Sequence, residues 1–196
     1  MTDNQDLKSF QRLVQKGKQT RKEPPIGDLF CLTLDPWETS QEFFWGRLIK
    51  KDCKIDGGTW WLTYIYNNPT ETQTSPDREW KFEDVLIAPD FDAKSRWNIG
   101  AYKSSGIVIP VTPEEQARTH YFKDFMSLYM DDRVLKHRDE YGNLVVPPKG
   151  VLLASYSIGS LATQAWSIDN ALGRNDLYDY RELNRRKYNN PNKTTN

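Results

Sequence analysis

Three consecutive runs rich in aromatic and β-branched residues, separated by turn-forming residues, constrain the fold of this chain most strongly. They are "DLFCLTL" (28–34), "EFFWGRLIK" (42–50) and "WWLTYIY" (60–66). Such runs are typical of β-strands, and the intervening "DPWETSQ" and "DCKIDGG" have the composition of turns. Because consecutive strands usually lie side by side, we expect an antiparallel meander with 60–66 as the central strand of the sheet.

Three later runs extend the strand pattern. They are "KFEDVLIA" (81–88), "SSGIVIPV" (104–111) and "GVLLASYS" (150–157). The expected fold class is therefore α+β. We expect a twisted, mostly antiparallel sheet of about five to seven strands that can curl towards a partly closed barrel, with one long helix packed on it and a short N-terminal helix.

The clearest helix signal begins at Thr112. This residue is a good N-cap, Pro113 occupies the first helical position, and Glu115 completes a capping box. Apolar residues recur at helical spacing from there to about Met130, which predicts the long helix. A second, shorter helix is expected over 165–172, followed by a glycine that ends it.

The length of 196 residues suits one domain with tails. Apolar residues at helical spacing between residues 7 and 14 predict an amphipathic helix, which the prolines of "RKEPP" end. The predicted organisation is an N-terminal helix and linker (1–24), a single α+β domain (25–173) and a basic polar C-terminal tail (174–196).

The charges balance over the whole chain but are unevenly distributed. Residues 1–24 and 174–196 each carry six Lys/Arg and three Asp/Glu, whereas 25–173 carries 15 basic and 21 acidic residues. An acidic body disfavours nucleic acid as a partner and suits a basic protein. There is no run of about 18 apolar residues and no signal-like start, so we expect a cytoplasmic protein that does not enter a membrane.

Residues for catalysis or metal binding form no recognisable set. The two histidines, His120 and His137, have no nucleophile at a familiar spacing, and the usual phosphate-loop, zinc and hydrolase motifs are absent from the sequence. Cys31 and Cys53 are interpreted as buried hydrophobic side chains. We therefore expect no enzyme, no cofactor and no metal.

Two clusters that combine aromatic and cationic residues are the candidate binding features. Trp45 and Arg47 are two residues apart, so a strand would place them on one face, either as an interface anchor or as a core tryptophan covered by arginine. "SRWNIGAY" (95–102) repeats the combination. We expect it to form a structural clasp in which Trp97 is buried and Arg96 pairs with a carboxylate such as Asp90 or Asp92 or stacks on an aromatic ring, with an exposed edge left for recognition.

Several of these strings occur in an order that resembles a known family. The strings are "IGDLFCLTL", "FFWGRLIKKD", "LTYIYN", "LIAPDFDAKSRWNIGAY" and "SIDNALG", and together they span 26–173. They resemble the immunity protein 26 family of bacterial polymorphic toxin systems. The resemblance implies a non-catalytic protein that binds the effector domain of a cognate toxin and neutralises it in the producing or neighbouring cell. The partner-binding candidates are Trp45, Arg47, Asp90, Asp92, Arg96 and Tyr102.

Two other functions remain open from the residues alone. A nucleic-acid-binding β-barrel module could use Trp45, Trp60, Trp61 and Trp97 as stacking platforms. A carboxylate-dependent enzyme could use the pair at 90 and 92, although acidic pairs of this kind are usually solvated loop residues.

Overall fold

The computed structural model describes residues 14–18, 22–34, 41–55, 57–124, 136–157 and 159–174. Most of the predicted N-terminal helix and all of the basic tail except Arg174 lie outside these ranges. Val14 is described and lies in the core, where it forms a β-bridge with Leu34.

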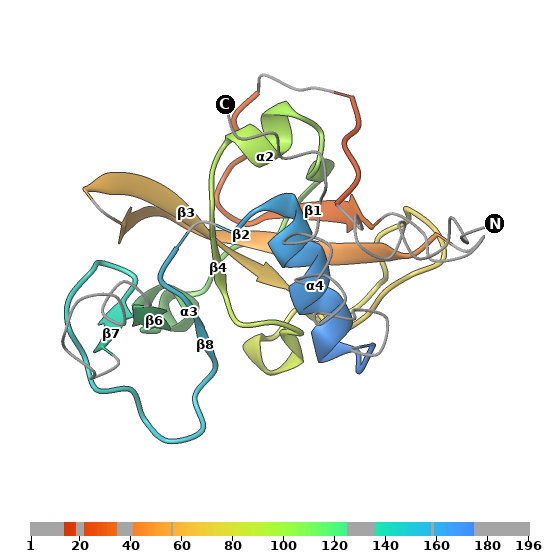
Figure 1. Ribbon diagram of the computed structural model, residues 1–196. Helices are drawn as coiled ribbons and strands as arrows, with labels where there is room; N and C mark the ends of the chain where they lie inside the picture. Colours follow the sequence, from red (N-terminus) through yellow and green to blue (C-terminus); the bar gives the residue numbers. More distant parts are fainter. Residues whose placement is uncertain are drawn as a thin grey trace, which may run out of the picture.

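A five-stranded antiparallel sheet forms the centre of the molecule (Figure 1), in the order β4-β3-β2-β1-β5. Its strands are β1 (Asp28–Thr33), β2 (Phe43–Ile55), β3 (Gly58–Ile65), β4 (Asp90–Asp92) and β5 (Lys103–Val108). The predicted meander is confirmed, but β2 and not β3 is central, because β4 and β5 add one strand on either side. Within the described ranges no pairing joins β4 to β5, so the sheet is open and the expected partial closure is not seen.

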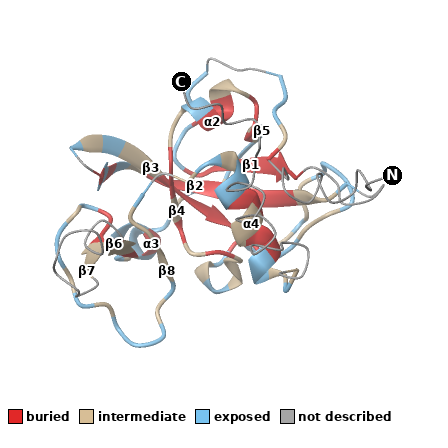
Figure 2. Cartoon of the chain, in the orientation of Figure 1, coloured by how far each residue is buried: buried red, intermediate tan, exposed pale blue. Residues whose placement is uncertain are grey.

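Strand β2 is buried on both faces along its first half (Figure 2), which explains its nearly continuous apolar sequence. Gly46 permits this close packing. A Cβ atom at this position would lie 2.4 Å from a ring atom of Phe30 and 2.6 Å from the carbonyl oxygen of Tyr64. A larger residue would therefore separate β2 from its neighbours.

Helices α2 (Ser95–Asn98) and α4 (Leu161–Ala171) contribute to the core on one face of the sheet. Ala165 and Ile168 of α4 are fully buried there. The helix begins at the N-cap Ser160, whose side chain accepts a hydrogen bond from the Thr163 amide. The core of this face consists of Val14, Phe30, Leu32, Leu34, Phe44, Leu48, Ile65, Ile87, Trp97, Ala101, Tyr102, Ala165 and Ile168.

A second core lies on the opposite face. It consists of Leu29, Cys31, Trp45, Ile49, Cys53, Ile55, Leu62, Tyr64, Tyr66, Trp80, Phe91 and Phe122. The prediction of buried thiols is confirmed, since Cys31 and Cys53 are free and buried. Burial raises the pKa of each thiol to about 12.

A smaller sheet of three strands lies beside the first, in the order β7-β6-β8. Its strands are β6 (Tyr121–Asp124), β7 (Lys136–Asp139) and β8 (Leu153–Ser155). β6 pairs antiparallel with β7 and parallel with β8. The ring of Phe122 stacks on Phe91 of β4, with 4.1 Å between the ring centroids, and so joins the two sheets.

The prediction of a long helix that begins at Thr112 is wrong. Its start is as expected, with the complete capping box, but the helix α3 spans only Pro113–Ala117. The amide of His120 donates to the carboxylate of Glu140 and not to a helical carbonyl, and β6 then begins at Tyr121. Residues 125–135 lie outside the described ranges. The longest described helix is instead α4, which begins four residues before the predicted start and ends next to Gly173, whose φ is 73°.

The other strand predictions have mixed outcomes. "SSGIVIPV" contains all of β5 except its first residue, Lys103, and "GVLLASYS" contains β8, as expected. "KFEDVLIA" does not form a strand. It contains a 3₁₀ helix (Phe82–Asp84), after which Val85 forms a single bridge with Tyr66. None of the helices in the described ranges has the length and apolar run that crossing a bilayer requires.

Candidate functional site

Trp45 and Arg47 lie on the same face of β2, as predicted, but both are buried. Trp45 is 1% and Arg47 2% exposed. The indole nitrogen of Trp45 donates to Thr70 Oγ1 at 3.0 Å, and the guanidinium of Arg47 donates to the carboxylate of Glu115. The interpretation of Trp45 as a core residue is therefore confirmed.

The clasp predicted in "SRWNIGAY" is also confirmed. Trp97 is 1% exposed, and Arg96 Nε donates to Asp92 Oδ1 at 3.0 Å. Gly100 has a φ of 70°, which permits the turn that follows Trp97. The hydroxyl of Tyr102 donates to Asp92 Oδ2 at 2.7 Å, so this residue belongs to the same cluster.

The interpretation of Asp90 and Asp92 as solvated loop residues is wrong, because both lie in β4 and Asp92 is fully buried. The structure brings Asp92, Arg96 and Tyr102 together, while Trp45 and Arg47 pack in the opposite core. Of the six predicted partner-binding residues, five are buried and Asp90 is half-buried. The buried five act here within the fold and offer almost no surface to a partner.

A groove of about 690 Å³ lies over the Arg47 face of the sheet, between segments 75–83 and 107–118. Its volume is in the range of known binding clefts. Arg47 and Glu115 form a nearly buried ion pair in its lining, with side chains that are 2% and 12% exposed. We refer to this feature as the groove.

The charged side chains of the groove are arranged by depth. The exposed carboxylates are Asp77, Glu79, Glu83 and Glu114, and Lys81 is the exposed base in the described lining. The guanidinium groups of Arg78 and Arg118 are more covered and lie over aromatic rings, at 5.3 Å from Trp80 and 4.1 Å from Phe82. The rim is therefore acidic, and the walls below it are aromatic and cationic.

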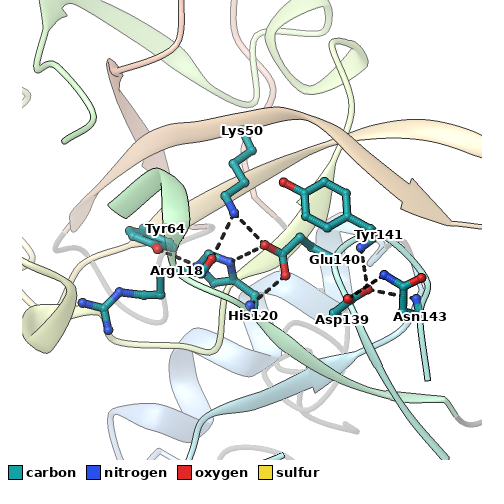
Figure 3. A network of polar contacts seen from close by, with 8 residues as sticks. All are labelled: Lys50, Tyr64, Arg118, His120, Asp139, Glu140, Tyr141 and Asn143. Atoms are coloured by element: carbon teal, nitrogen blue, oxygen red, sulfur yellow. Dashed lines mark hydrogen bonds and ion pairs between the residues drawn. The ribbon is translucent and has the colours of Figure 1, made fainter. Parts of the chain in front are cut away.

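A buried polar network fixes one wall of the groove (Figure 3). Lys50 Nζ donates to Glu140 Oε1 at 2.6 Å and to the carbonyl oxygen of Arg118 at 3.0 Å. The amide of His120 donates to Glu140 Oε2 at 2.8 Å. Tyr64 Oη lies 2.6 Å from His120 Nε2, which connects the network to β3. We call these four side chains, Lys50, Tyr64, His120 and Glu140, the clamp.

The electrostatics of the clamp stabilise a neutral imidazole beside a charged carboxylate. Burial lowers the pKa of His120, although hydrogen bonding to Glu140 opposes this. Burial alone would raise the pKa of Glu140, but hydrogen bonds from His120 and Lys50 outweigh it and hold the pKa at about 2. The charge of Glu140 is therefore matched by that of Lys50.

The carboxylate of Glu140, the imidazole of His120 and the phenol of Tyr64 lie in a row, as in a proton relay, but these groups are not accessible to a substrate. Tyr64 is 0% and His120 3% exposed, and burial raises the pKa of Tyr64 well above its ordinary value. The clamp instead connects β2 and β3 to the chain before β6 and after β7 (Figure 3). It thereby fixes the position of Arg118 on the wall of the groove.

The turn that carries Glu140 is itself stabilised. Asp139 Oδ1 accepts hydrogen bonds from the amides of Tyr141 and Asn143, both at 2.9 Å. Sequence reasoning missed Lys50 and Glu140 altogether and treated His120 as an isolated histidine. The available signal in the sequence was that His120 directly precedes a strand. This signal is too weak to identify Glu140, 20 residues away, as its partner.

Exposed apolar side chains lie beside the groove. Ile107 and Val108 of the edge strand β5 are 45% and 49% exposed, and Ile26 is 41% exposed. Ile26 lies close to the end of β5, because the carbonyl oxygen of the next residue, Gly27, accepts a hydrogen bond from the amide of Ile109. Ile107 also contributes to the lining of the groove, so the acidic rim and this apolar edge are adjacent.

Comparisons with protein-family models, curated proteins and solved structures found no match to the chain. In the part of the chain that the structure describes, His, Cys, Asp and Glu side chains form no group of three or more suited to hold a metal ion.

Proposed function

We propose that this protein is an immunity protein that binds a cognate bacterial toxin domain through the groove and the adjacent edge of β5. The observation that carries the proposal is the acidic rim of the groove next to exposed apolar side chains. Adjacent charged and apolar surfaces of this kind are typical of protein-binding sites. The assignment to a toxin system rests on the resemblance of the ordered sequence strings.

The two parts of this surface have different roles in the proposed complex. The rim carboxylates attract a basic toxin and increase the rate of association. β5 is an edge strand, and an extended segment of the partner would pair with its outer side, while Ile107 and Val108 would contribute buried apolar area. Neutralisation then requires contact alone and no reaction.

Charge reversal on the rim tests the proposal. A variant with Glu83→Lys and Glu114→Lys should associate with the toxin domain about tenfold more slowly, as measured by surface plasmon resonance. The matched control carries Glu71→Lys and Asp52→Lys, which change the net charge equally at exposed positions outside the groove. The control should protect cells that co-express the toxin, and the rim variant should protect them less.

Two results would contradict the proposal at different levels. Equal association rates for the two variants would show that the rim does not face the partner. If a toxin encoded beside this protein neither co-purifies with it nor loses its lethality on co-expression, the immunity function itself is wrong.

A further inference from the structure

A second cavity, of about 550 Å³, is lined by residues of α4, β8 and the segment that leads into β4. Among the described residues, none lines both this cavity and the groove. Its walls are mixed, because apolar side chains lie beside hydroxyl and amide side chains and the two charged residues Asp90 and Lys123. The apolar lining consists of Leu86, Ile87, Ala88, Leu153, Ala154, Trp166 and Ala171.

Asp90 places a carboxylate in this apolar lining. Its Oδ1 atom accepts a hydrogen bond from the Phe91 amide at 2.9 Å. Its Oδ2 atom lies close to Gly159, where a Cβ atom would approach it to 2.9 Å. The lack of a side chain at Gly159 therefore makes room for the carboxylate.

Nearby donors do not neutralise this carboxylate. Arg96 Nε donates to Asp92, and the Nη2 atom of Arg96 donates to the carbonyl oxygen of Gly159. Among the described residues, no Lys, Arg or His forms an ion pair with Asp90. Asp92, by contrast, accepts from Arg96, Thr63 and Tyr102. Lys123 lines the same cavity, but among the described residues it forms no ion pair with Asp90. The charged form of this carboxylate is therefore costly, and a cationic ligand at Asp90 would lower the cost.

We propose that the cavity binds an alkyl-guanidinium or alkyl-ammonium group, with the cation at Asp90 and the aliphatic stem against the apolar walls. The ring of Trp166 in the lining suits both parts, because aromatic rings attract cations and pack against methylene groups. The group can come from a free amine or guanidine, or from a Lys or Arg side chain of a protein partner. This site is separate from the groove and does not depend on the proposed immunity function.

The binding should depend on pH. Burial, followed by the charge of Asp92, raises the pKa of Asp90 to about 8. The charged groups that face Asp90 are Asp92 on the same strand, Arg96 of α2 and Lys123 of β6. A guanidinium stays charged throughout this range, so ionisation of Asp90 should increase its affinity by about tenfold between pH 7 and pH 9.

Titration with n-butylguanidinium, followed by isothermal calorimetry and amide NMR shifts, tests the proposal. A ligand of this size should bind with a Kd of about 1 mM. Asp90→Asn should weaken binding about tenfold or more, because a charge-assisted hydrogen bond is lost. Asp52→Asn, at an exposed position outside both the cavity and the groove, is the matched control and should bind as the wild type does. The neutral isostere n-butylurea should bind about tenfold more weakly than the cation.

The proposal is overturned by equal affinity in Asp90→Asn, by a flat pH profile, or by no saturation up to about 50 mM. A neutral peptide that contains one arginine distinguishes the two sources. If the peptide binds more tightly than n-butylguanidinium, and Asp90→Asn abolishes this binding, the ligand is the side chain of a protein partner. If n-butylguanidinium binds more tightly and Asp90→Asn again abolishes binding, the ligand is a small molecule. The groove variants leave this cavity unchanged, so the two proposals can fail independently.

Discussion

Several charged side chains of this protein are buried, so removing one of them should have a large effect on stability. Arg47 and Glu115 pair with side chains that are 2% and 12% exposed. The neighbouring Glu114 is 87% exposed and lies 3.7 Å from Arg118. Two adjacent glutamates therefore form ion pairs in very different surroundings, and removing one charge should matter far more than removing the other.

Glu115→Gln should lower the free energy of unfolding by about 3 kcal/mol, because it leaves the charge of Arg47 buried without a partner. Glutamine preserves the capping box of α3, so the loss reports the charge. Glu114→Gln is the control and should change the stability by less than about 0.5 kcal/mol. Urea denaturation of the three proteins measures the difference, and equal small losses would show that Arg47 is effectively solvated.

The separation of contacting residues along the chain explains which candidate residues could be predicted from the sequence. The clasp of Arg96, Trp97 and Gly100 is a local turn beside a short acidic strand, so its composition predicts its structure. Lys50 and Glu140 are 90 residues apart and become partners only through the fold. Neither has a distinctive neighbour in the sequence, and therefore the clamp could not be found from local patterns.

At the scale of elements, strands were easier to predict than helices. The meander β1-β2-β3 follows from the three apolar runs, although β2 continues through residues 52–55, which the sequence assigns to a turn. The helix start at Thr112 follows equally from its capping box, but capping residues do not determine a helix length. Phe122 is better buried by stacking on Phe91 in a second sheet than on a continued helix, which is a tertiary effect. The second sheet was therefore missed.

Alanine substitutions of two tryptophans in contact, Trp97 and Trp61, test how deeply each ring is buried. Trp97 is 1% exposed and makes edge-on contacts with Phe30, Trp61 and Tyr102. Trp97→Ala should therefore cost about 3–5 kcal/mol. Trp61 is less well covered, since its ring is half-buried and lies under Lys51 Nζ at 4.6 Å.

We expect Trp61→Ala to cost about half as much as Trp97→Ala, since less apolar area is lost from the core. Chemical denaturation with a fixed m-value compares the two variants directly. A larger loss for Trp61 than for Trp97 would contradict the burial that the structure assigns to these rings.

At the scale of the whole molecule, the clamp joins the central sheet to the chain around the smaller sheet. The folded pKa of Glu140 is about 2, below its ordinary value of 4.5. The native state therefore releases this proton more readily than the unfolded chain does. The resulting stabilisation is fully present above about pH 4.5 and is lost as the pH falls towards 2.

Glu140→Gln should lower the free energy of unfolding by about 3 kcal/mol at pH 7, because Lys50 stays buried without its partner. The difference from the wild type should shrink as the pH falls from 4.5 towards 2. Urea titrations of both proteins at pH 7, 5, 4 and 3 measure this trend. A difference that does not depend on pH would mean that packing, and not the charge of Glu140, stabilises the clamp.

The burial of Cys31 and Cys53 makes the protein its own reporter of unfolding. With a pKa of about 12, almost no thiolate exists in the native state at neutral pH. Both side chains stay shielded from solvent while β2 remains paired with β1 near Cys31 and with β3 at Cys53. Alkylating reagents should therefore modify these residues at the rate at which the central sheet opens. The rate of thiol alkylation would therefore measure how often the central sheet opens in the native state.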